Sequence, residues 1–539
     1  MTNVVDVVQS KRASDAPART HRSWSILILL LGLAIAATVI ALKFSALHSW
    51  RYTSDLFVID TMFQETLRGD FMMEYTYGCQ FGDHACLIFL LGIPIKYLLR
   101  QNMVYALLLV SPVTLIGCGP ILYFAIRSIA GAAWALLGAL LYFLSLGVIR
   151  GPFEVVFGFH IDTISGYIAT AIAVLLLERH EVKRTRSLTL LTLALIIIFI
   201  TLKEEMALLG IFFFIMLLIW KRDWLHWTGL ALSIVAFGVE MGLTHYLRTP
   251  WNRTNERLVG HLITSFRRDG IHFLFSHEKT GYWIAIFTLI AAMSTLIIIC
   301  KRISIIAAAL FAIGLAKLAF GWAVNDFDLF AWHNYPAVCM LTGGIILQSL
   351  ELRRLPPPNL RLIKPAVAAL LVLSIGWFIV GEARYAVVQA RLNRMEKKKN
   401  LPFMPAIADV QKHIPEKSKV VAIPRYSVAS WTAGWRYSFF PHGITQSPMG
   451  IADYIVVTRN KERYAVPELR VFSQIYQNGK YKLFLRKKFL PGELESREKF
   501  AKRFGEDSIG PNPTPAQRNR KKKAKQKHPA VTTRSAPAS

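Results

Sequence analysis

The chain has 539 residues, of which 53% are hydrophobic, and its mean hydropathy is positive at +0.38. Its formal net charge of +29 would point to nucleic acid in a soluble protein. Here, however, Lys and Arg gather at the ends of apolar runs and in the C-terminal tail, where they set orientation in a membrane. The composition therefore excludes a soluble globular protein, and no nucleic-acid partner is predicted. The five Cys residues show neither a CxxC nor a paired metal spacing, so neither a zinc site nor a disulfide framework is predicted.

Apolar runs of about 20 residues, the length that crosses a bilayer as a helix, recur along the chain. The first, Trp24 to Phe44, lacks a small-residue cleavage site and is predicted to be a retained helix rather than a signal peptide. The stretch Ala85 to Leu99 is short and holds Gly92, Pro94 and Lys96, so we expect a half-inserted or interfacial helix. Eleven spans are predicted, at 24–44, 103–126, 131–149, 163–178, 188–203, 206–220, 227–247, 282–299, 303–323, 333–350 and 364–381.

The density of Lys and Arg separates the connecting segments into two sets. One set of short turns holds 13 Lys and Arg in 36 residues, and the other set holds 12 in 118 residues. Because basic residues favour the cytoplasmic side, the first set and residues 1–23 are predicted to be cytoplasmic, with the first loop, 45–102, outside. Counting 85–99 as a span would move the basic turns 183–186 and 353–354 outside, so charge favours eleven spans.

Hydropathy falls after Val380, and residues 382–490 are predicted to form a small soluble α/β domain. Because this domain follows an odd number of spans, it is predicted to lie outside the cytoplasm. Residues 477–479 are predicted to form a turn. Short buried strands are predicted at 417–424, 452–458 and 481–485.

Residues 491–539, which include the basic run Arg518 to Lys527, have the composition of a disordered tail. The predicted fold is mainly α: a multi-pass helix bundle in the cytoplasmic (inner) membrane, residues 24–381, followed by the small extracytoplasmic α/β domain. Membrane lipids are its expected surroundings.

Acidic and histidine side chains gather in the segments predicted to be outside. Ionisable groups near a bilayer are costly, so their convergence favours a functional site. His160 and Asp162 form an HxD pair, which would orient both side chains alike on an extended segment. Lys203, Glu204 and Glu205 follow one another in a tight turn between two helices. The candidate site residues are Asp55, Asp83, His84, His160, Asp162, Lys203, Glu204, Glu205, Asp326 and His333.

Each of these residues also has a purely structural explanation. Asp55 could cap a helix that runs to Leu67. Asp60 lies five residues on, about 140° round that helix, and is predicted to be solvated or structural. A lone HxD is a weak metal signal, and the Glu204–Glu205 pair could be a solvated hairpin. Lys203 would then neutralise the pair, or it could bind a phosphate.

Four short motifs resemble, in order and spacing, a bacterial family of predicted membrane proteins catalogued as domain of unknown function 2079. The strand Ala452-Asp453-Tyr454-Ile455 is similar to the C-terminal end of the same family, so the resemblance covers roughly residues 50 to 460. The four motifs are Ser54-Asp55-Leu56-Phe57, Phe81-Gly82-Asp83-His84, Gly158-Phe159-His160-Ile161-Asp162 and Lys203-Glu204-Glu205.

That family is similar in turn to the C-type (GT-C) glycosyltransferases. The resemblance implies transfer of a sugar from a polyprenyl-phosphate donor to an envelope glycan or lipid acceptor on the outer face of the membrane. It implies that Asp55 is the catalytic base, while His84, His160 and Lys203 are candidates to lie near the phosphate. The first loop lacks a DxD or ExD pair, so no cofactor is predicted with certainty. A divalent cation held by Asp55, His160 and Asp162 is left open.

A transporter or flippase is the alternative function. In that case the outer acids and histidines would relay protons or bind a headgroup. Transporters usually place such groups near the bilayer midplane and contain inverted repeats, and the sequence shows neither. A non-enzymatic envelope scaffold would leave the clustered acids unexplained.

The predicted topology can be tested with single cysteines and an impermeant thiol reagent. Cysteines at Glu181, Lys221 and Pro357 are expected to stay unlabelled in intact cells, because the basic turns hold these positions in the cytoplasm. Cysteines at Glu154, Thr254 and Asn478 are expected to be labelled. Labelling at position 181 in intact cells would overturn the topology.

Overall fold

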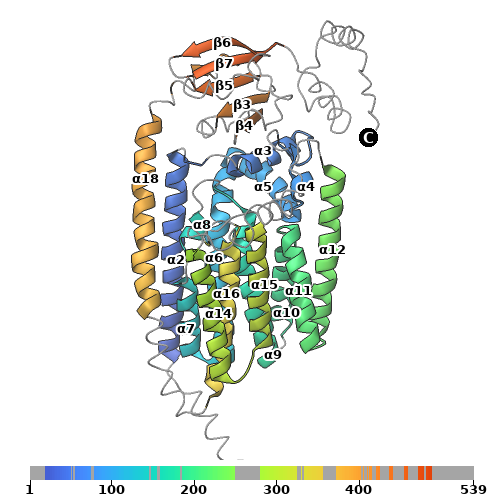
Figure 1. Cartoon of the computed structure of the whole chain (residues 1–539), viewed down its shortest axis with the longest axis vertical. Helices are drawn as coiled ribbons and strands as arrows, with labels where there is room; N and C mark the ends of the chain where they lie inside the picture. The colour runs from blue at the N-terminus through green and yellow to red at the C-terminus, as the bar shows by residue number, and fades with distance from the viewer. Residues whose placement is uncertain are drawn as a thin grey trace, which may run out of the picture.

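A bundle of long helices with a small β-sheet at one end makes up the computed structural model of the chain (Figure 1). The structure describes residues 18–49, 51–52, 55–74, 78–144, 147–153, 158–182, 185–248, 280–323, 329, 333–355 and 372–401. In the C-terminal part it describes residues 405, 409–410, 412–414, 420–424, 436–440, 454–458, 472–478 and 481–487. The predicted tail, 491–539, lies outside the described residues, as do Glu154, Thr254 and Pro357.

Each predicted span overlaps a helix, although the helix Ala132–Phe143 ends before the predicted end at 149, and residues 364–371 of the last span are not described. The first ten helices are α2 (Ala18–His48), α6 (Met103–Ala130), α7 (Ala132–Phe143), α9 (Ser165–Glu181), α10 (Arg186–Ile200), α11 (Glu204–Trp220), α12 (Trp224–Leu247), α14 (Thr280–Cys300), α15 (Ile305–Ala323) and α16 (Tyr335–Ser349).

The eleventh helix is a continuous segment, 372–400, that includes the π-helical turn η7 (Phe378–Ala383) and α18 (Arg384–Asn400). Six helices in the described part of the chain are long and apolar enough to cross a bilayer. The protein is therefore a multi-pass membrane protein, and the count of eleven spans stays a prediction.

The turns predicted to be cytoplasmic come together in space. Arg353 forms an ion pair with Glu181 and donates a hydrogen bond of 2.8 Å to the carbonyl oxygen of Ile129. Arg179 pairs with Asp223 across 3.1 Å. Four of the turns separated on charge density therefore meet at one end of the bundle.

The short apolar stretch after His84 does not cross the bundle. It forms a 3₁₀ turn, η1 (Leu87–Leu91), and the helix α5 (Gly92–Leu99), which are together too short to span a bilayer. Helix α5 packs on α3 (Asp55–Leu67), where a Cβ at Gly92 would lie 2.3 Å from Cζ of Phe63. Tyr97 on its other side is 71% exposed.

A buried ion pair fixes α5 to α3. The Lys96 ammonium lies 2.6 Å from the Asp60 carboxylate, and both side chains are buried. The expectation that Asp60 could be solvated is therefore wrong, and its structural alternative holds. The sequence could not show this, because the partner lies 36 residues further along the chain.

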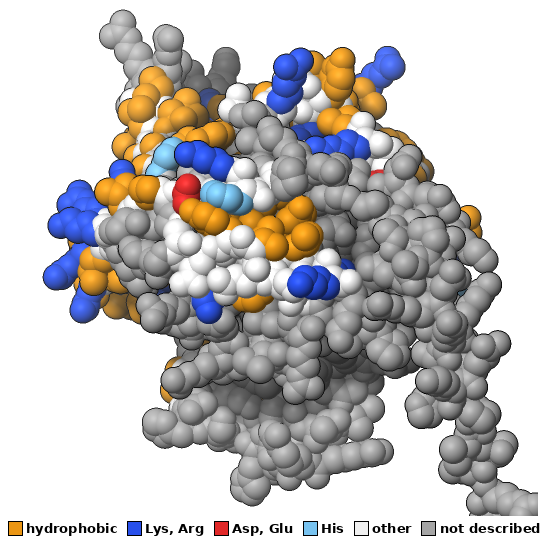
Figure 2. Space-filling model, turned by 90° about the horizontal axis from the view of Figure 1, so that it is seen from above, with side chains coloured by type: hydrophobic (Ala, Val, Ile, Leu, Met, Phe, Trp, Pro, Cys, Tyr) orange, Lys and Arg blue, Asp and Glu red, His pale blue; other side chains and the backbone are white. Residues whose placement is uncertain are grey.

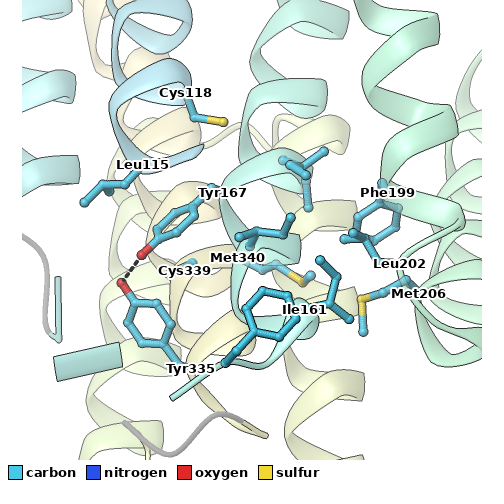
Figure 3. Packing of buried hydrophobic residues seen from close by; sticks show 14 of the residues in the cluster. Leu115, Cys118, Ile161, Tyr167, Phe199, Leu202, Met206, Tyr335, Cys339 and Met340 are labelled. Carbon is cyan, nitrogen blue, oxygen red and sulfur yellow. Dashed lines mark hydrogen bonds between the residues drawn. The ribbon is translucent and has the colours of Figure 1, made fainter. Parts of the chain in front are cut away.

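The centre of the bundle is formed by α6, α9 and α16. Helix α9 is surrounded on nearly all sides, with 94% of its apolar window buried. The hydroxyl groups of Tyr167 on α9 and Tyr335 on α16 are joined by a hydrogen bond of 2.8 Å (Figure 3). Cys118, Cys339 and Met340 lie near this pair (Figure 3). The Thr170 hydroxyl group on α9 is also buried here and donates a hydrogen bond of 2.9 Å to the carbonyl oxygen of Gly166.

The last long helix continues beyond the predicted domain boundary at 382. Helix α18 lies beside α2 (Figure 1), and Arg51 bonds to Gln389 at 3.0 Å and to Asn393 on it. Glu382 pairs with Arg150 across 3.1 Å. The polar residues after Val380 thus cover α2 instead of starting the soluble unit.

The C-terminal sheet has five strands in the order β4-β3-β5-β7-β6. Strand β3 runs parallel to β4 and β5, and β7 runs antiparallel to β5 and β6. The sheet lies at the same end of the bundle as α3 and α5 (Figure 1). Three strands match the prediction, while β4 and β6 were not predicted. The strands are β3 (Val420–Pro424), β4 (Arg436–Phe440), β5 (Tyr454–Thr458), β6 (Phe472–Asn478) and β7 (Tyr481–Arg486).

The Asp60–Lys96 pair gives a prediction about stability. Asp60→Asn leaves the buried Lys96 ammonium without its counter-charge, which should lower the free energy of unfolding by about 3 to 5 kcal/mol. Thermal unfolding in detergent measures this loss. Adding Lys96→Met should recover much of it, whereas a single variant as stable as the wild type would contradict the role of the pair.

Candidate functional site

Lys203 is the centre of a buried group of charged side chains at the end of the bundle that carries the sheet. Its ammonium lies 3.3 Å from Oδ2 of Asp162 and 3.4 Å from Oε1 of Glu205, and its side chain is 5% exposed. Lys203 has an extended backbone immediately before α11. The connection between α10 and α11 therefore presents its side chain to the start of α9.

Lys317 on α15 completes this group. Its fully buried ammonium lies 2.5 Å from Oε2 of Glu205, so the carboxylate of Glu205 bridges two lysines. Burial by itself would raise the pKa of Glu205. The ammonium groups of Lys203 and Lys317 together have the larger effect, so the pKa of Glu205 lies below its ordinary value. Lys317 is not among the predicted site residues, because it lies inside the apolar run 303–323. A single lysine within such a run is costly, and this cost could have marked Lys317 as a candidate site residue.

His84 and Glu204 form a second pair. Nδ1 of His84 lies 2.6 Å from Oε1 of Glu204, and the His84 side chain is 28% exposed. The backbone N–H of Ile88 donates a 2.9 Å hydrogen bond to the carbonyl oxygen of Thr201, which docks the His84 segment onto the α10–α11 connection. The dyad is therefore held by main-chain contact as well as by its own hydrogen bond.

The charge state of His84 is set by opposing neighbours. Burial and the Lys203 ammonium lower its pKa, whereas Glu204 and Asp83 raise it, and the net effect is upward. An imidazolium is thereby favoured close to the predicted interface. Asp83 is half-buried beside it.

The local folds differ from the sequence expectation in two places. Asp162 lies inside a 3₁₀ turn, η3 (Ile161–Ile164), so the HxD pair is not on a single extended segment, although His160 itself is extended. Glu204 and Glu205 form the first turn of α11 rather than a tight hairpin. Carboxylates are favoured there because the helix N-terminus carries partial positive charge.

Gly158 allows the HxD segment to approach the first outer segment closely. Its φ of +81° is in the left-handed region, and a Cβ there would lie 2.9 Å from the ring of Tyr52. The Lys43 ammonium on α2 donates to the Gly158 carbonyl oxygen at 3.3 Å. His160 is thus held near the outer end of α2.

The other predicted residues are described only in part. Asp55 is the first residue of α3, and its side chain lies outside the described residues. Asp326 also lies outside them. His333 is half-buried, and its charged surroundings are Lys203, Lys317, Asp162 and Glu205.

Among the described side chains, no group of three or more His, Cys, Asp and Glu is placed to hold a metal ion. Asp162 faces the Lys203 ammonium instead. A site that includes Asp55, His160 and Asp162 stays a prediction, because the side chain of Asp55 is not described.

The described surface above the site is basic (Figure 2), whereas the buried site contains both acidic and basic side chains. In the view from above, Lys and Arg side chains gather at several places on the described part of the face, and few acidic atoms are visible (Figure 2). Asp162 and Lys203 are buried beneath it. On the described part of this face, Lys and Arg are therefore exposed above a buried ion pair (Figure 2).

Comparison with known proteins gives a partial likeness. No model of a known protein family matches the chain, so the resemblance to the family of unknown function 2079 stays a prediction. No curated protein matches it either.

Among solved structures, ArnT from Cupriavidus metallidurans in the apo state is 14% identical, with a TM-score of 0.49 over 86% of this chain and 98% of that one. ArnT bound to undecaprenyl phosphate is 12% identical, with a TM-score of 0.47 over 84% and 97%. The Archaeoglobus fulgidus oligosaccharyltransferase, in complex with Zn and sulfate, is 10% identical, with a TM-score of 0.45 over 85% and 73%. Because these TM-scores are all below 0.5, the function has to be inferred from the site of this chain.

The raised pKa of His84 predicts a pH-dependent contribution to stability. A group whose pKa rises on folding stabilises the fold fully below its ordinary value of about 6.5, by about 1.4 kcal/mol per pKa unit. That contribution is lost as the pH rises through the folded-state value. The stability difference between wild type and His84→Asn in detergent should therefore shrink as the pH rises above about 6.5. A difference that grows with pH would contradict the assignment.

Proposed function

We propose that the protein transfers a sugar from a polyprenyl-phosphate donor to an envelope glycan or lipid acceptor. One observation carries this proposal: residues from three separate predicted outer segments converge on a single group at one end of the bundle. His84 precedes η1, Asp162 precedes α9, and Lys203 with the two glutamates begins α11. Such convergence of costly charges is expected of a site and not of separate solvated loops.

The chemistry of the group suits a lipid-linked phosphate. An apolar helix bundle accommodates the lipid tail, while the phosphate has to stay at the membrane interface, where cations are needed. The imidazolium of His84 is the partly exposed cation of this group. The buried ammonium of Lys203 is a second positive charge that acts on it. These groups would stabilise the negative charge that develops on the leaving phosphate.

Asp55 is the proposed general base. A carboxylate would take the proton from the acceptor hydroxyl while that oxygen attacks the anomeric carbon and the polyprenyl phosphate leaves. Helix α3, which Asp55 begins, packs on α5 at the same end as the charged group. A direct inversion needs only one such base.

The substitution Asp55→Asn tests this assignment. Asn caps a helix about as well as Asp but cannot accept a proton, so the rate should fall on the order of 10²-fold while the stability is retained. Consumption of a lipid-linked sugar by the protein in liposomes, and loss of an envelope glycan in a complemented deletion strain, measure the effect.

Glu181→Gln is the matched control. It removes a carboxylate at the opposite end, where Glu181 pairs with Arg353 and Arg354. The control should leave the rate per folded molecule unchanged. Full activity of Asp55→Asn at wild-type protein level would refute the base and favour the transporter or flippase.

A further inference from the structure

Glu240 on α12 is a buried acid to which neither the sequence motifs nor the proposed mechanism gives a role. It is the only Asp or Glu within Trp224–Leu247. Helix α12 exposes most of its apolar surface, since 22% of its window is buried, yet Glu240 is 0% exposed. Glu240 lies on the buried face of the helix, where buried residues recur every three or four positions. This face includes Gly229, Ser233, Ala236 and Thr244.

The surroundings of Glu240 leave its carboxyl group unsatisfied. Within the described part of the chain, neither of its oxygens has a hydrogen-bond partner. The Leu87 backbone amide faces it, but no hydrogen bond of normal geometry joins the two. An ionised carboxylate in such a place would lack the compensation that burial requires.

Glu204, on the helix that packs along α12, has a hydrogen-bond partner among the described residues for one of its two carboxylate oxygens. Helices α11 and α12 pack along each other, and Glu204 is the charged group that acts on Glu240. Oε1 of Glu204 bonds to His84, whereas its Oε2 is buried without a partner. Two carboxyl groups that repel each other in a medium of low dielectric constant cannot both be ionised without a cost, and one proton between them removes that cost.

We propose that Glu240 is protonated and donates its O–H to Oε2 of Glu204, directly or through one water, so that it is a positioning residue for the His84–Glu204 dyad. The carboxylate of Glu204 then receives one hydrogen bond from each side. The other titratable groups of this region are Asp83 and Cys86 on the His84 segment and Lys203 before α11.

A charge balance supports the arrangement. The described part of the group contains four carboxyl groups, those of Asp162, Glu204, Glu205 and Glu240, of which Asp162 and Glu240 are buried. It contains three cations, which are Lys203, Lys317 and the imidazolium of His84. Each of the first three carboxylates has a cation within a few ångströms, and Glu240 has none in the described residues. A proton on Glu240 makes the sum of these seven charges zero, and the half-buried Asp83 beside His84 is outside this set. Its consequence for catalysis, a fixed cationic His84, rests on the proposed function, but the protonation does not.

Two variants separate a protonated from an ionised Glu240. Glu240→Gln keeps a neutral hydrogen-bond donor, and Glu240→Leu removes it. Thr244→Val is the matched control, because Thr244 lies one turn away on the same stripe. The full-length protein in lipid nanodiscs would be titrated by NMR with labelled histidine, with His84 assigned from its absence in His84→Asn.

The expected result is that Glu240→Gln and Thr244→Val leave the pKa of His84 within about 0.3 unit of the wild type, while Glu240→Leu shifts it by about half a unit or more. A fall of about one unit or more in Glu240→Gln would overturn the proposal, because it would mean that a negative charge had been removed. An unchanged pKa in Glu240→Leu would overturn the hydrogen bond.

Infrared spectroscopy gives an independent readout that needs no activity. The carbonyl band of a protonated carboxylic acid, which shifts in D₂O, should be present in the wild type and lost in Glu240→Gln. Persistence of the whole band in that variant would contradict the protonation. Because neither readout uses the transfer reaction, failure of the proposed function and failure of this inference are distinguishable.

Discussion

The ammonium of Lys203 lies between the carboxylates of Asp162 and Glu205, and the end of the bundle that carries the sheet depends on this contact. A buried charge without a partner costs several kcal/mol, so each of these groups requires the others to be in place. The contact ties the start of α9 to the α10–α11 connection, and Glu205 extends it to Lys317 on α15. Three elements that are far apart in the sequence are thereby held together at the same end of the bundle.

Charged side chains are paired at both ends of the bundle. At the end with the basic turns, Arg354 and Glu181 form a partly exposed pair, and Arg179 and Asp223 form a buried one. At the end with the sheet, lysines and acids are enclosed, and His84 keeps an open edge. Strong electrostatic interactions at a partly closed site are what transfer of a charged leaving group requires. The proposed site lies at this end, where the lysines and acids lie close to the partly open His84.

The predicted site was incomplete in a systematic way. Residues in polar motifs, such as His84 and Glu204, were found because they interrupt an apolar chain at the connections between helices. Lys317 and Glu240 were missed because each is a single ionisable residue within a long apolar run. The HxD pair was found but given the wrong backbone, since the spacing of two residues does not distinguish an extended segment from a 3₁₀ turn.

By itself, the sequence determined that the chain is a multi-pass helix bundle, where its helices lie and which turns share an end, because hydropathy and charge act locally along the chain. It also placed α5 outside the set of spans. Only the tertiary structure decided that Asp60 is paired with Lys96, that α18 covers α2, and that Glu205 is paired with Lys317. Those contacts join residues separated by tens to hundreds of positions. A pattern of neighbouring residues contains no information about which distant side chain will neutralise a buried charge.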